Sequence, residues 1–316
     1  MSTLTLYEKF SAGLKKFLSV FPSDGLYAPI HYLLNIHGKR IRPLLVLSVC
    51  EAEGSSIEKA MPAAIAVELF HNFTLMHDDI MDKAPLRRGQ LTVHKVYGEA
   101  AAILSGDAMF TLASISLQDI NESTLLEILK IYNRTSREVC EGQQLDMDFE
   151  NMNDVTTEHY LEMIRLKTSV LIACSCAMGA ISAGASKERV ELWYKFGEQT
   201  GLAFQIQDDL LDTFGNSDIT GKKVGGDILL EKKTFIWLYT KAKGMLPENL
   251  SSCLESIDKI SLVSSAMIQS GADIAARKTM MEYTENARTA LSQLDLSSDH
   301  LKTFENLLSS VTERTS

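Results

Sequence analysis

Apolar residues in this chain recur mostly three or four positions apart, the spacing that places them on one face of an α-helix. Pro43 opens one apolar run, and Pro62 opens a longer one that reaches Asp82 before Pro85 ends it. Further helical patterns cover residues 125–141, 190–211, 272–294 and 301–311. Alternating β-branched runs are nearly absent. We therefore expect an all-α fold, a helix bundle around a central cleft.

The pattern gives no sign of separate domains. The chain has 316 residues, of which 45% are hydrophobic, and its 6 prolines do not gather into a linker. Neither a repeat nor a low-complexity tract is visible. Residues 215–234 are rich in glycine and lysine, which is typical of a loop or lid. We expect one helical domain over residues 1–316.

Composition and charge indicate the cellular compartment of the protein and exclude some classes of binding partner. The net charge of −10 argues against nucleic acid as a partner, although two small basic groups, at residues 39–42 and 87–88, could hold an anion. The 5 cysteines show no metal-binding or redox spacing, and residues 1–20 lack the apolar block of a signal peptide. Residues 168–186 are uncharged, but their small side chains favour a packed interior helix over a membrane span. We expect a cytoplasmic protein.

The end of the helix that opens at Pro62 carries three acidic residues, Asp78, Asp79 and Asp82. Asp78 and Asp82 are four positions apart, so they share one helix face. Carboxylates this close repel one another unless a cation lies among them, and Mg²⁺ prefers such oxygen ligands. A solvated helix end is the alternative, although the helix dipole disfavours acids there. Taken alone, this cluster leaves both interpretations open.

A second cluster repeats the same spacing with Asp208, Asp209 and Asp212, again after a long apolar helical pattern. Two such clusters could hold several Mg²⁺ ions, and we expect three, around one diphosphate. The glycine and the terminal glutamate of an EF-hand loop are missing, and so is a Gly-rich nucleotide-binding loop. The repetition favours metal binding over chance surface charge.

At this point the sequence resembles the trans-type isoprenyl diphosphate synthases, the polyprenyl synthetase family. The resemblance covers roughly residues 35–240 and rests on many elements in order. They are Gly38-Lys39-Arg40-Ile41-Arg42-Pro43, both aspartate clusters, Arg87-Arg88-Gly89, Gly106-Asp107, Gly142-Gln143 with Asp146, Lys167-Thr168, Phe204-Gln205-Ile206-Gln207, Gly221-Lys222 and Lys232. The family adds isopentenyl diphosphate to an allylic diphosphate with Mg²⁺, and its members are usually dimers, so the resemblance implies a homodimeric prenyltransferase.

The resemblance also implies a role for each matching residue. Asp78, Asp82 and Asp208 would bind Mg²⁺, and Asp79, Asp209 and Asp212 would support the metals. The diphosphate of isopentenyl diphosphate would lie on Lys39, Arg42, His71 and Arg88. The allylic diphosphate would lie on Arg87, Lys167, Lys222 and Lys232, with Gln143 and Asp146 at the rim of the same cavity.

The chemistry explains these residue types. An allylic C–O bond must ionise, and cations stabilise the diphosphate as it leaves. The carbocation needs a water-free pocket with oxygen dipoles, for which Thr168 and Gln205 are candidates. No side-chain nucleophile is required. Taken without the resemblance, His71 could be a packed core residue and residues 221–233 only a solvated loop.

Residues just before the first cluster form the floor of the product tunnel in this family. On an ideal helix Thr74 lies ~40° from Asp78 and Phe73 ~140° away, so Phe73 is an oblique plug and Thr74 leaves space. One aromatic residue at this place resembles the type that makes C20 products. We expect geranylgeranyl diphosphate, with the C15 farnesyl diphosphate as the alternative.

Two other functions were weighed against this one. A class I terpene cyclase would share the fold but usually replaces the second aspartate cluster and lacks the isopentenyl diphosphate site. A non-catalytic subunit of a synthase would typically have lost one cluster. Both clusters are complete here. Some family members end in a basic tail that closes over the substrates, whereas residues 311–316 here do not form such a tail, which leaves closure by this end open.

Overall fold

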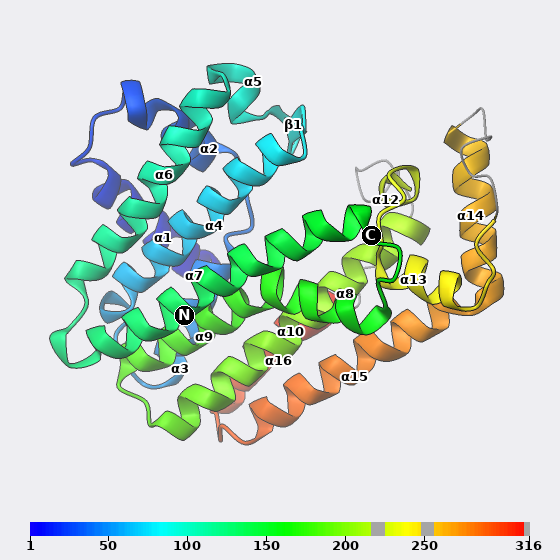
Figure 1. The fold of residues 1–316 in the computed structure, drawn as a ribbon. Coiled ribbons are helices and arrows are strands. Elements are labelled where there is room, and N and C mark those ends of the chain that lie inside the picture. The colour runs from blue at the N-terminus through cyan, green and yellow to red at the C-terminus, as the bar shows by residue number, and fades with distance from the viewer. Residues whose placement is uncertain (216–224, 248–255, 313–316) are drawn as a thin grey trace. The chain divides into compact units, whose positions relative to one another are not determined.

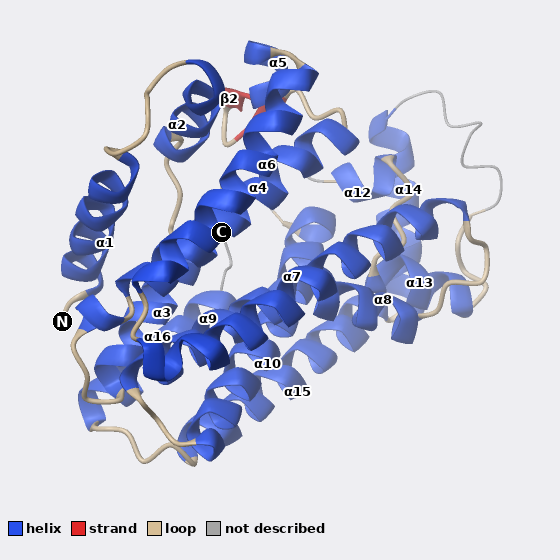
Figure 2. Cartoon of the chain, turned by 60° about the vertical axis from the view of Figure 1, so that its left-hand side comes forward, coloured by secondary structure: helices blue, strands red, loops and turns tan. Residues whose placement is uncertain are grey.

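The computed structural model describes residues 1–215, 225–247 and 256–312, and nearly all of them lie in helices (Figure 1). The expected all-α class is confirmed. Within the described residues, strands occur only in a short antiparallel ribbon, where β1 (Leu86–Arg87) pairs with β2 (Gln90–Leu91) (Figure 2). The ribbon follows directly after the first aspartate cluster.

The helices follow one another with short connections. In chain order they are α1 (Thr3–Leu18), α2 (Ala28–Asn35), α3 (Ile41–Ala52), α4 (Met61–Met81), α5 (Val93–Tyr97), α6 (Glu99–Ser116), α7 (Glu122–Asn151), α8 (Thr157–Ile164), α9 (Val170–Ala183), α10 (Lys187–Phe214), α12 (Gly226–Leu229), α13 (Phe235–Ala242), α14 (Ser256–Ser270), α15 (Ala272–Ser292) and α16 (Ser298–Thr312). Short 3₁₀ turns lie at Gly25–Tyr27, Ile57–Lys59 and Leu117–Asp119. The short helix α12 falls inside the stretch expected to be a loop.

The chain forms two compact units. The first comprises Met1–Tyr132 with Ser175–Val190, and the second Asn133–Cys174 with Glu191–Ser316. Three long helices, α7, α9 and α10, contribute residues to both units. A single domain over the whole chain remains a prediction.

Helix α4 is the central element of the first unit and packs on α6, α3 and α1. Its side toward these helices is fully buried and rich in small residues such as Ala63, Ala64 and Ala66, which let neighbouring helices approach closely. Pro62 lies in its first turn, as expected, and Asp82 caps its end. The first aspartate cluster therefore ends a helix whose apolar side is buried within this unit.

The second unit has its own apolar core between α8, α10, α13 and α15. Buried residues from all four helices meet there, including Ile164, Ile206, Trp237 and Ala276. The C-terminal part of α10 thus has an apolar side toward this core and a half-buried side that carries Asp208 and Asp212. Burial of the apolar side sets which way the second aspartate cluster faces.

Among the described residues, two helical stretches are long and apolar enough to cross a membrane. One runs over Thr157–Ala183 and is 83% buried, as expected for a packed interior helix. The other, Glu99–Asp119, is 44% buried. Two such stretches are weak evidence for a membrane span, because the core helices of water-soluble proteins have the same length and composition.

Between α8 and α9 the helix widens into a π-helical turn at Arg165–Ser169, which carries Lys167 and Thr168. Glycines on the neighbouring helices allow close contact with it. A Cβ at Gly142 of α7 would lie 2.3 Å from the backbone nitrogen of Lys167, and one at Gly201 of α10 would lie 2.7 Å from Cα of Ser169. The π turn is therefore held between two helices at positions where a larger residue does not fit. Such widened turns often occur at functional sites.

We predict that Gly142→Ala destabilises the second unit by about 1–3 kcal/mol, because the added methyl overlaps backbone atoms that cannot yield as a side chain can. Displacing the π turn should also lower activity. Urea unfolding measures the first effect and steady-state kinetics the second. Cys140→Ala, at an exposed position on the same helix, is the matched control. Equal stability of the two variants would contradict the close packing.

Candidate active site

Asp78, Asp79 and Asp82 lie at the end of α4 but face different surroundings. Asp79 is 1% exposed and accepts hydrogen bonds from Arg87, whose Nε lies 2.9 and 2.8 Å from its two carboxylate oxygens and whose Nη2 lies 2.8 Å from Oδ1. Asp78 is half-buried and Asp82 is exposed. The outer two carboxylates therefore remain on the accessible side of the helix, where they can bind a cation, while the middle one anchors the β-ribbon.

The basic loop before α3 is held by a buried ion pair. Arg40, in the left-handed backbone region with φ 49°, pairs with Glu68 of α4 and also donates to the carbonyl of Leu34. Glu68 is 2% exposed and also accepts from Asn72 Nδ2 at 2.6 Å. The sequence indicated only that Arg40 is part of a basic group. Its contact with Glu68 holds the residues on either side of it in place.

Arg42 and His71 form the buried part of the basic cluster. Arg42 Nη1 lies 3.1 Å from His71 Nε2. Burial lowers the pKa of Arg42 to about 10. Burial, followed by the charges of Arg42, Arg88 and Arg87, lowers the pKa of His71 well below its usual value, so His71 is neutral at pH 7 and accepts from Arg42. Arg42 Nε is buried without a hydrogen-bond partner among the described residues, as expected where an anion would bind.

Lys39 and Arg88 complete the predicted isopentenyl diphosphate cluster within the first unit. Arg88 lies in the turn of the β-ribbon with φ 50°, and its Nη1 approaches the carbonyl of His37 at 3.4 Å. The charges of Arg40 and Arg87 help to lower its pKa, after burial. These mutually repelling cations are typical of a site that binds a multiply charged anion.

Phe73 and Thr74 occupy the last full turns of α4 before the aspartates. The Phe73 ring lies 5.3 Å from Phe110 of α6 and 4.8 Å from His77, centroid to centroid. Thr74 donates its hydroxyl to the carbonyl of His71 at 2.8 Å. Phe73 thus belongs to an aromatic group on the α6 side of α4. This arrangement agrees with an oblique plug.

In the second aspartate cluster, as in the first, the middle carboxylate is more deeply buried than the outer two. Asp208 and Asp212 are half-buried, whereas Asp209 is 3% exposed. Tyr160 of α8 donates its hydroxyl to Asp209 Oδ2 at 2.5 Å, and Gln205 Nε2 lies 3.4 Å from Oδ1. Burial raises the pKa of Asp209 to about 8, and burial together with Asp209 raises that of Tyr160 well above 10. The phenol therefore keeps its proton and acts as the donor.

Asp212 anchors the segment that follows the helix. Its carboxylate accepts from the backbone N–H of Asp227 at 2.9 Å, and its carbonyl accepts from Gly225 at 2.7 Å. The backbone N–H of Lys232 in turn donates to the carbonyl of Asp227. Predicted site residue Lys222 lies outside the described residues. Neither Tyr160 nor Asp227 was singled out from the sequence.

The π turn contributes two further predicted residues. Lys167 Nζ lies 2.5 Å from Asp146 Oδ2 of α7, and Thr168 donates to Gln205 Oε1 at 3.3 Å. Gln143 lies one residue after the glycine that contacts this turn. The second unit therefore groups Asp146, Lys167, Thr168 and Gln205 beside its aspartate cluster.

The donor sets fit magnesium and diphosphate. No group of three or more His, Cys, Asp or Glu side chains in the described parts of the chain is arranged to hold a metal alone. Mg²⁺ commonly takes only one or two carboxylates and completes its coordination with phosphate oxygens and water. Asp78 with Asp82, and Asp208 in the second unit, offer such oxygens. Basic side chains also lie within each unit, Arg42 and Arg88 in the first and Lys167 in the second.

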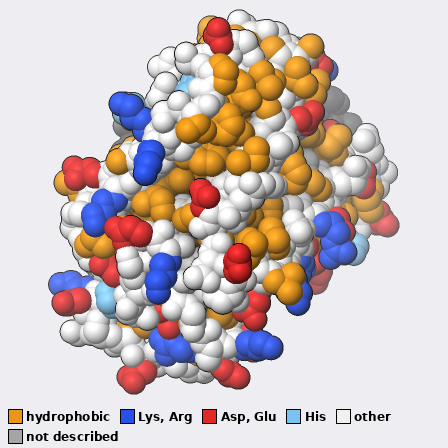
Figure 3. Space-filling model, turned by 90° about the vertical axis from the view of Figure 1, so that its left-hand side faces the viewer, with side chains coloured by type: hydrophobic (Ala, Val, Ile, Leu, Met, Phe, Trp, Pro, Cys, Tyr) orange, Lys and Arg blue, Asp and Glu red, His pale blue; other side chains and the backbone are white. Residues whose placement is uncertain are grey.

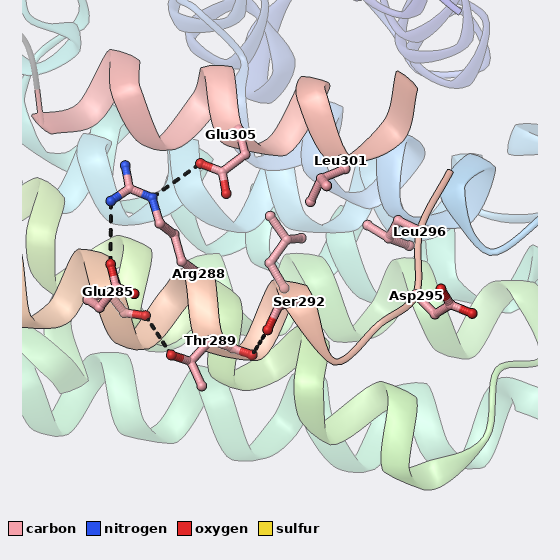
Figure 4. A pocket seen from close by; sticks show the side chains of 9 residues that line it. Glu285, Arg288, Thr289, Ser292, Asp295, Leu296, Leu301 and Glu305 are labelled. Atoms are coloured by element: carbon pink, nitrogen blue, oxygen red, sulfur yellow. Dashed lines mark hydrogen bonds and ion pairs between the residues drawn. The ribbon is translucent and has the colours of Figure 1, made fainter. Parts of the chain in front are cut away.

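A separate cavity of about 390 Å³ lies between α15 and α16 (Figure 4). Three leucines, Leu291, Leu296 and Leu301, form part of its lining. Arg288 at its edge pairs with Glu285 and Glu305. None of the predicted site residues lines this cavity, so we assign no chemistry to it.

Comparison with known proteins agrees with these features. The chain matches the family model of polyprenyl synthetase over residues 23–267. It is 36% identical over 285 residues to a geranylgeranyl diphosphate synthase of Methanosarcina mazei, covering 90% of this chain and 88% of that protein. It is also 36% identical over 296 residues to a geranylfarnesyl diphosphate synthase of Natronomonas pharaonis, covering 88% and 86%.

The fold of the chain is also similar to that of a solved structure. The fold is similar to the crystal structure of a geranylgeranyl pyrophosphate synthase, with a TM-score of 0.94, 41% sequence identity and coverage of 100% of both chains. The family match extends over the basic loop, both aspartate clusters, the π turn and Lys232. The chain belongs to the polyprenyl synthetase family.

Proposed function

We propose that this chain condenses isopentenyl diphosphate head-to-tail with an allylic diphosphate, with Mg²⁺, to give geranylgeranyl diphosphate. The observation that carries the proposal is the repeated aspartate cluster, in which two outer carboxylates lie on the accessible side and the middle one is buried. Similarity to several geranylgeranyl diphosphate synthases supports it. Membership of the family makes the chain a prenyltransferase.

Each cluster of residues has a task in this reaction. Lys39, Arg42, His71 and Arg88 bind the diphosphate of isopentenyl diphosphate, and neutral His71 orients the Arg42 guanidinium. Arg87, Lys167, Lys222 and Lys232 bind the allylic diphosphate. Mg²⁺, when bound to Asp78, Asp82 and Asp208, withdraws charge from the leaving diphosphate.

The bond changes then follow without a side-chain nucleophile. The allylic C–O bond breaks and its electron pair leaves with the diphosphate. The oxygens of Thr168 and Gln205 stabilise the carbocation. The double bond of isopentenyl diphosphate attacks the cation, forming the new C–C bond, and the released diphosphate takes the proton that restores a double bond.

The packing of Phe73 supports a product of limited length. Its ring lies against Phe110 and His77 on one side of α4, while Thr74 lies on another. Growth of the tail past Thr74 would end where the aromatic group blocks the path. Relatives of similar identity bear the names of synthases for geranylgeranyl and for geranylfarnesyl diphosphate. We propose C20 as the main product.

We predict that the purified protein, given isopentenyl diphosphate, Mg²⁺ and each allylic primer separately, forms a C20 diphosphate. Phe73→Ala should lengthen the product by at least one C5 unit, because it removes the aromatic plug. Mass spectrometry of the products measures both. Phe21→Ala, which removes an aromatic ring far along the chain from the aspartates, is the control. If the wild-type protein forms a C15 product, the proposed reaction stands but the tunnel assignment is rejected. If Phe73→Ala forms the same product as the wild-type protein, the tunnel assignment is also rejected.

Replacement of one ligand from each cluster tests the magnesium site. Asp78→Asn and Asp208→Asn should each lower kcat by about 10²-fold or more, because a neutral amide stabilises Mg²⁺ poorly. Both should also reduce the Mg²⁺-dependent thermal stabilisation produced by a bisphosphonate, a diphosphate mimic. Asp154→Asn, at an exposed position, is the control. Full stabilisation of either variant would exclude that residue as a ligand.

We also propose that the enzyme is a cytoplasmic homodimer. Hydrophobic side chains gather on the face drawn in Figure 3, and α6 exposes Ile103, Leu104 and Phe110, with Leu126 exposed at the start of α7. Covering such a face would remove apolar surface from water. Cys50 and Cys140 are free thiols, as in a reducing compartment.

Sedimentation equilibrium should therefore give twice the chain mass of 35.0 kDa. Leu104→Asp should shift the equilibrium toward the monomer, because it places a charge on the apolar face of α6. Leu4→Asp, at an exposed apolar position of α1, is the matched control. A monomeric wild-type protein at micromolar concentration would reject the dimer.

A further inference from the structure

The middle aspartate of each cluster faces away from the metal side of its helix. Asp79 and Asp209 are 1% and 3% exposed, while the outer acids of both clusters are more accessible. A buried carboxylate needs hydrogen-bond donors, since burial without them is costly. In the first unit Arg87 provides them. In the second unit the closest described donor to the carboxylate is a neutral phenol, Tyr160.

We propose that Tyr160 is a positioning residue for the magnesium ligand Asp208. The hydroxyl of Tyr160 holds Asp209 against α8 and thereby fixes the rotation of α10 that directs Asp208 outward. The inference rests on the proposed metal role of Asp208 and assigns a function to a residue outside both aspartate clusters.

The hydrogen bonds around Asp209 connect three elements. Tyr160 extends from α8 and donates to Oδ2, while Gln205, one turn earlier on α10, donates to Oδ1. Thr168 of the π turn donates to the carbonyl oxygen of the same Gln205. The chain of contacts therefore runs from Tyr160 through the second aspartate cluster to the two oxygens proposed to face the carbocation. Movement of Asp209 would disturb both.

The surroundings explain why the hydroxyl matters separately from the ring. The Tyr160 ring belongs to the apolar core with Ile164, Ile206 and Trp237, so phenylalanine would fill the same space. Carboxylates at Asp146, Asp208 and Asp227 act electrostatically on the pair. Without the phenol, Asp209 loses its shortest hydrogen bond inside this acidic environment and is driven toward water, which lies on the side of Asp208.

Tyr160→Phe tests the proposal, with Tyr194→Phe near the start of α10 as the matched control. The primary measurement is the Mg²⁺ concentration that gives half of the thermal stabilisation by a bisphosphonate. Replacing residues that orient a metal ligand typically costs 10- to 100-fold in metal affinity or activity, and Tyr160 would orient Asp208 through Asp209. We expect a rise of about 10-fold or more in that concentration for Tyr160→Phe, and a fall in kcat of similar size.

The KM for isopentenyl diphosphate should stay within about twofold, because its proposed ligands belong to the first unit and make no described contact with Tyr160. A purely structural role would lower the melting temperature of the unliganded protein but leave the Mg²⁺ requirement unchanged. Tyr160→Phe with a wild-type Mg²⁺ requirement therefore overturns the proposal.

A second substitution keeps the test valid if Tyr160→Phe does not fold. Asp209→Leu removes the acceptor at similar volume and should raise the Mg²⁺ requirement in the same way. Adding Tyr160→Phe to Asp209→Leu should then have little further effect, since the partner is already absent. Equal and additive effects would mean that the hydroxyl acts independently of Asp209. If the wild-type protein shows no Mg²⁺-dependent stabilisation, the metal assignment itself fails.

Discussion

Like charges held close together are the constraint on which this structure depends. Carboxylates that repel one another gather at the ends of α4 and α10, and guanidinium groups gather around Arg42. Such groups are stable only where the fold supplies partners or where ligands of opposite charge bind. The structure supplies partners for some of them, Arg87 for Asp79 and Glu68 for Arg40. We propose that magnesium and diphosphate neutralise the charge that remains.

The helices make this arrangement possible because they bring rigid, apolar faces to the site. The apolar sides of α4 and α10 are buried, so the aspartates at their ends cannot rotate away from the accessible side without exposing core residues. The π turn has the same role for Lys167 and Thr168. Its backbone approaches Gly142 and Gly201 too closely for any larger residue. Packing thus positions the polar groups of the π turn, where Lys167 pairs with Asp146 and Thr168 with Gln205.

The two clusters share a design with one difference. In both, the middle aspartate turns inward and accepts a hydrogen bond that steadies the helix end. Arg87 brings a positive charge to the first cluster, whereas Tyr160 brings none to the second. Burial beside this neutral donor raises the pKa of Asp209 to about 8, so the two middle acids differ in charge as well as in partner.

Much of the fold was predictable from the sequence, because hydrophobic spacing and proline positions are local signals. The helix from Pro62 to Asp82 and the patterns behind α10, α15 and α16 appeared within a few residues of their observed bounds. Helix α6 was missed, since near-uniform apolar sequences carry weak periodicity, and α13 was missed because it has only 8 residues. The division into two compact units depends on contacts between distant segments, which no local pattern encodes.

By itself the sequence determined the residue types of the site, because spacing within one helix decides which aspartates share a face. The sequence could not show that the middle aspartate of each cluster is buried and hydrogen-bonded, because its partner, Arg87 or Tyr160, lies on another structural element. Burial around His71 and the ion pair of Arg40 with Glu68 also arise only when α3 packs on α4. Tertiary structure decided these features, because burial and hydrogen bonding depend on which residues the folded chain brings together.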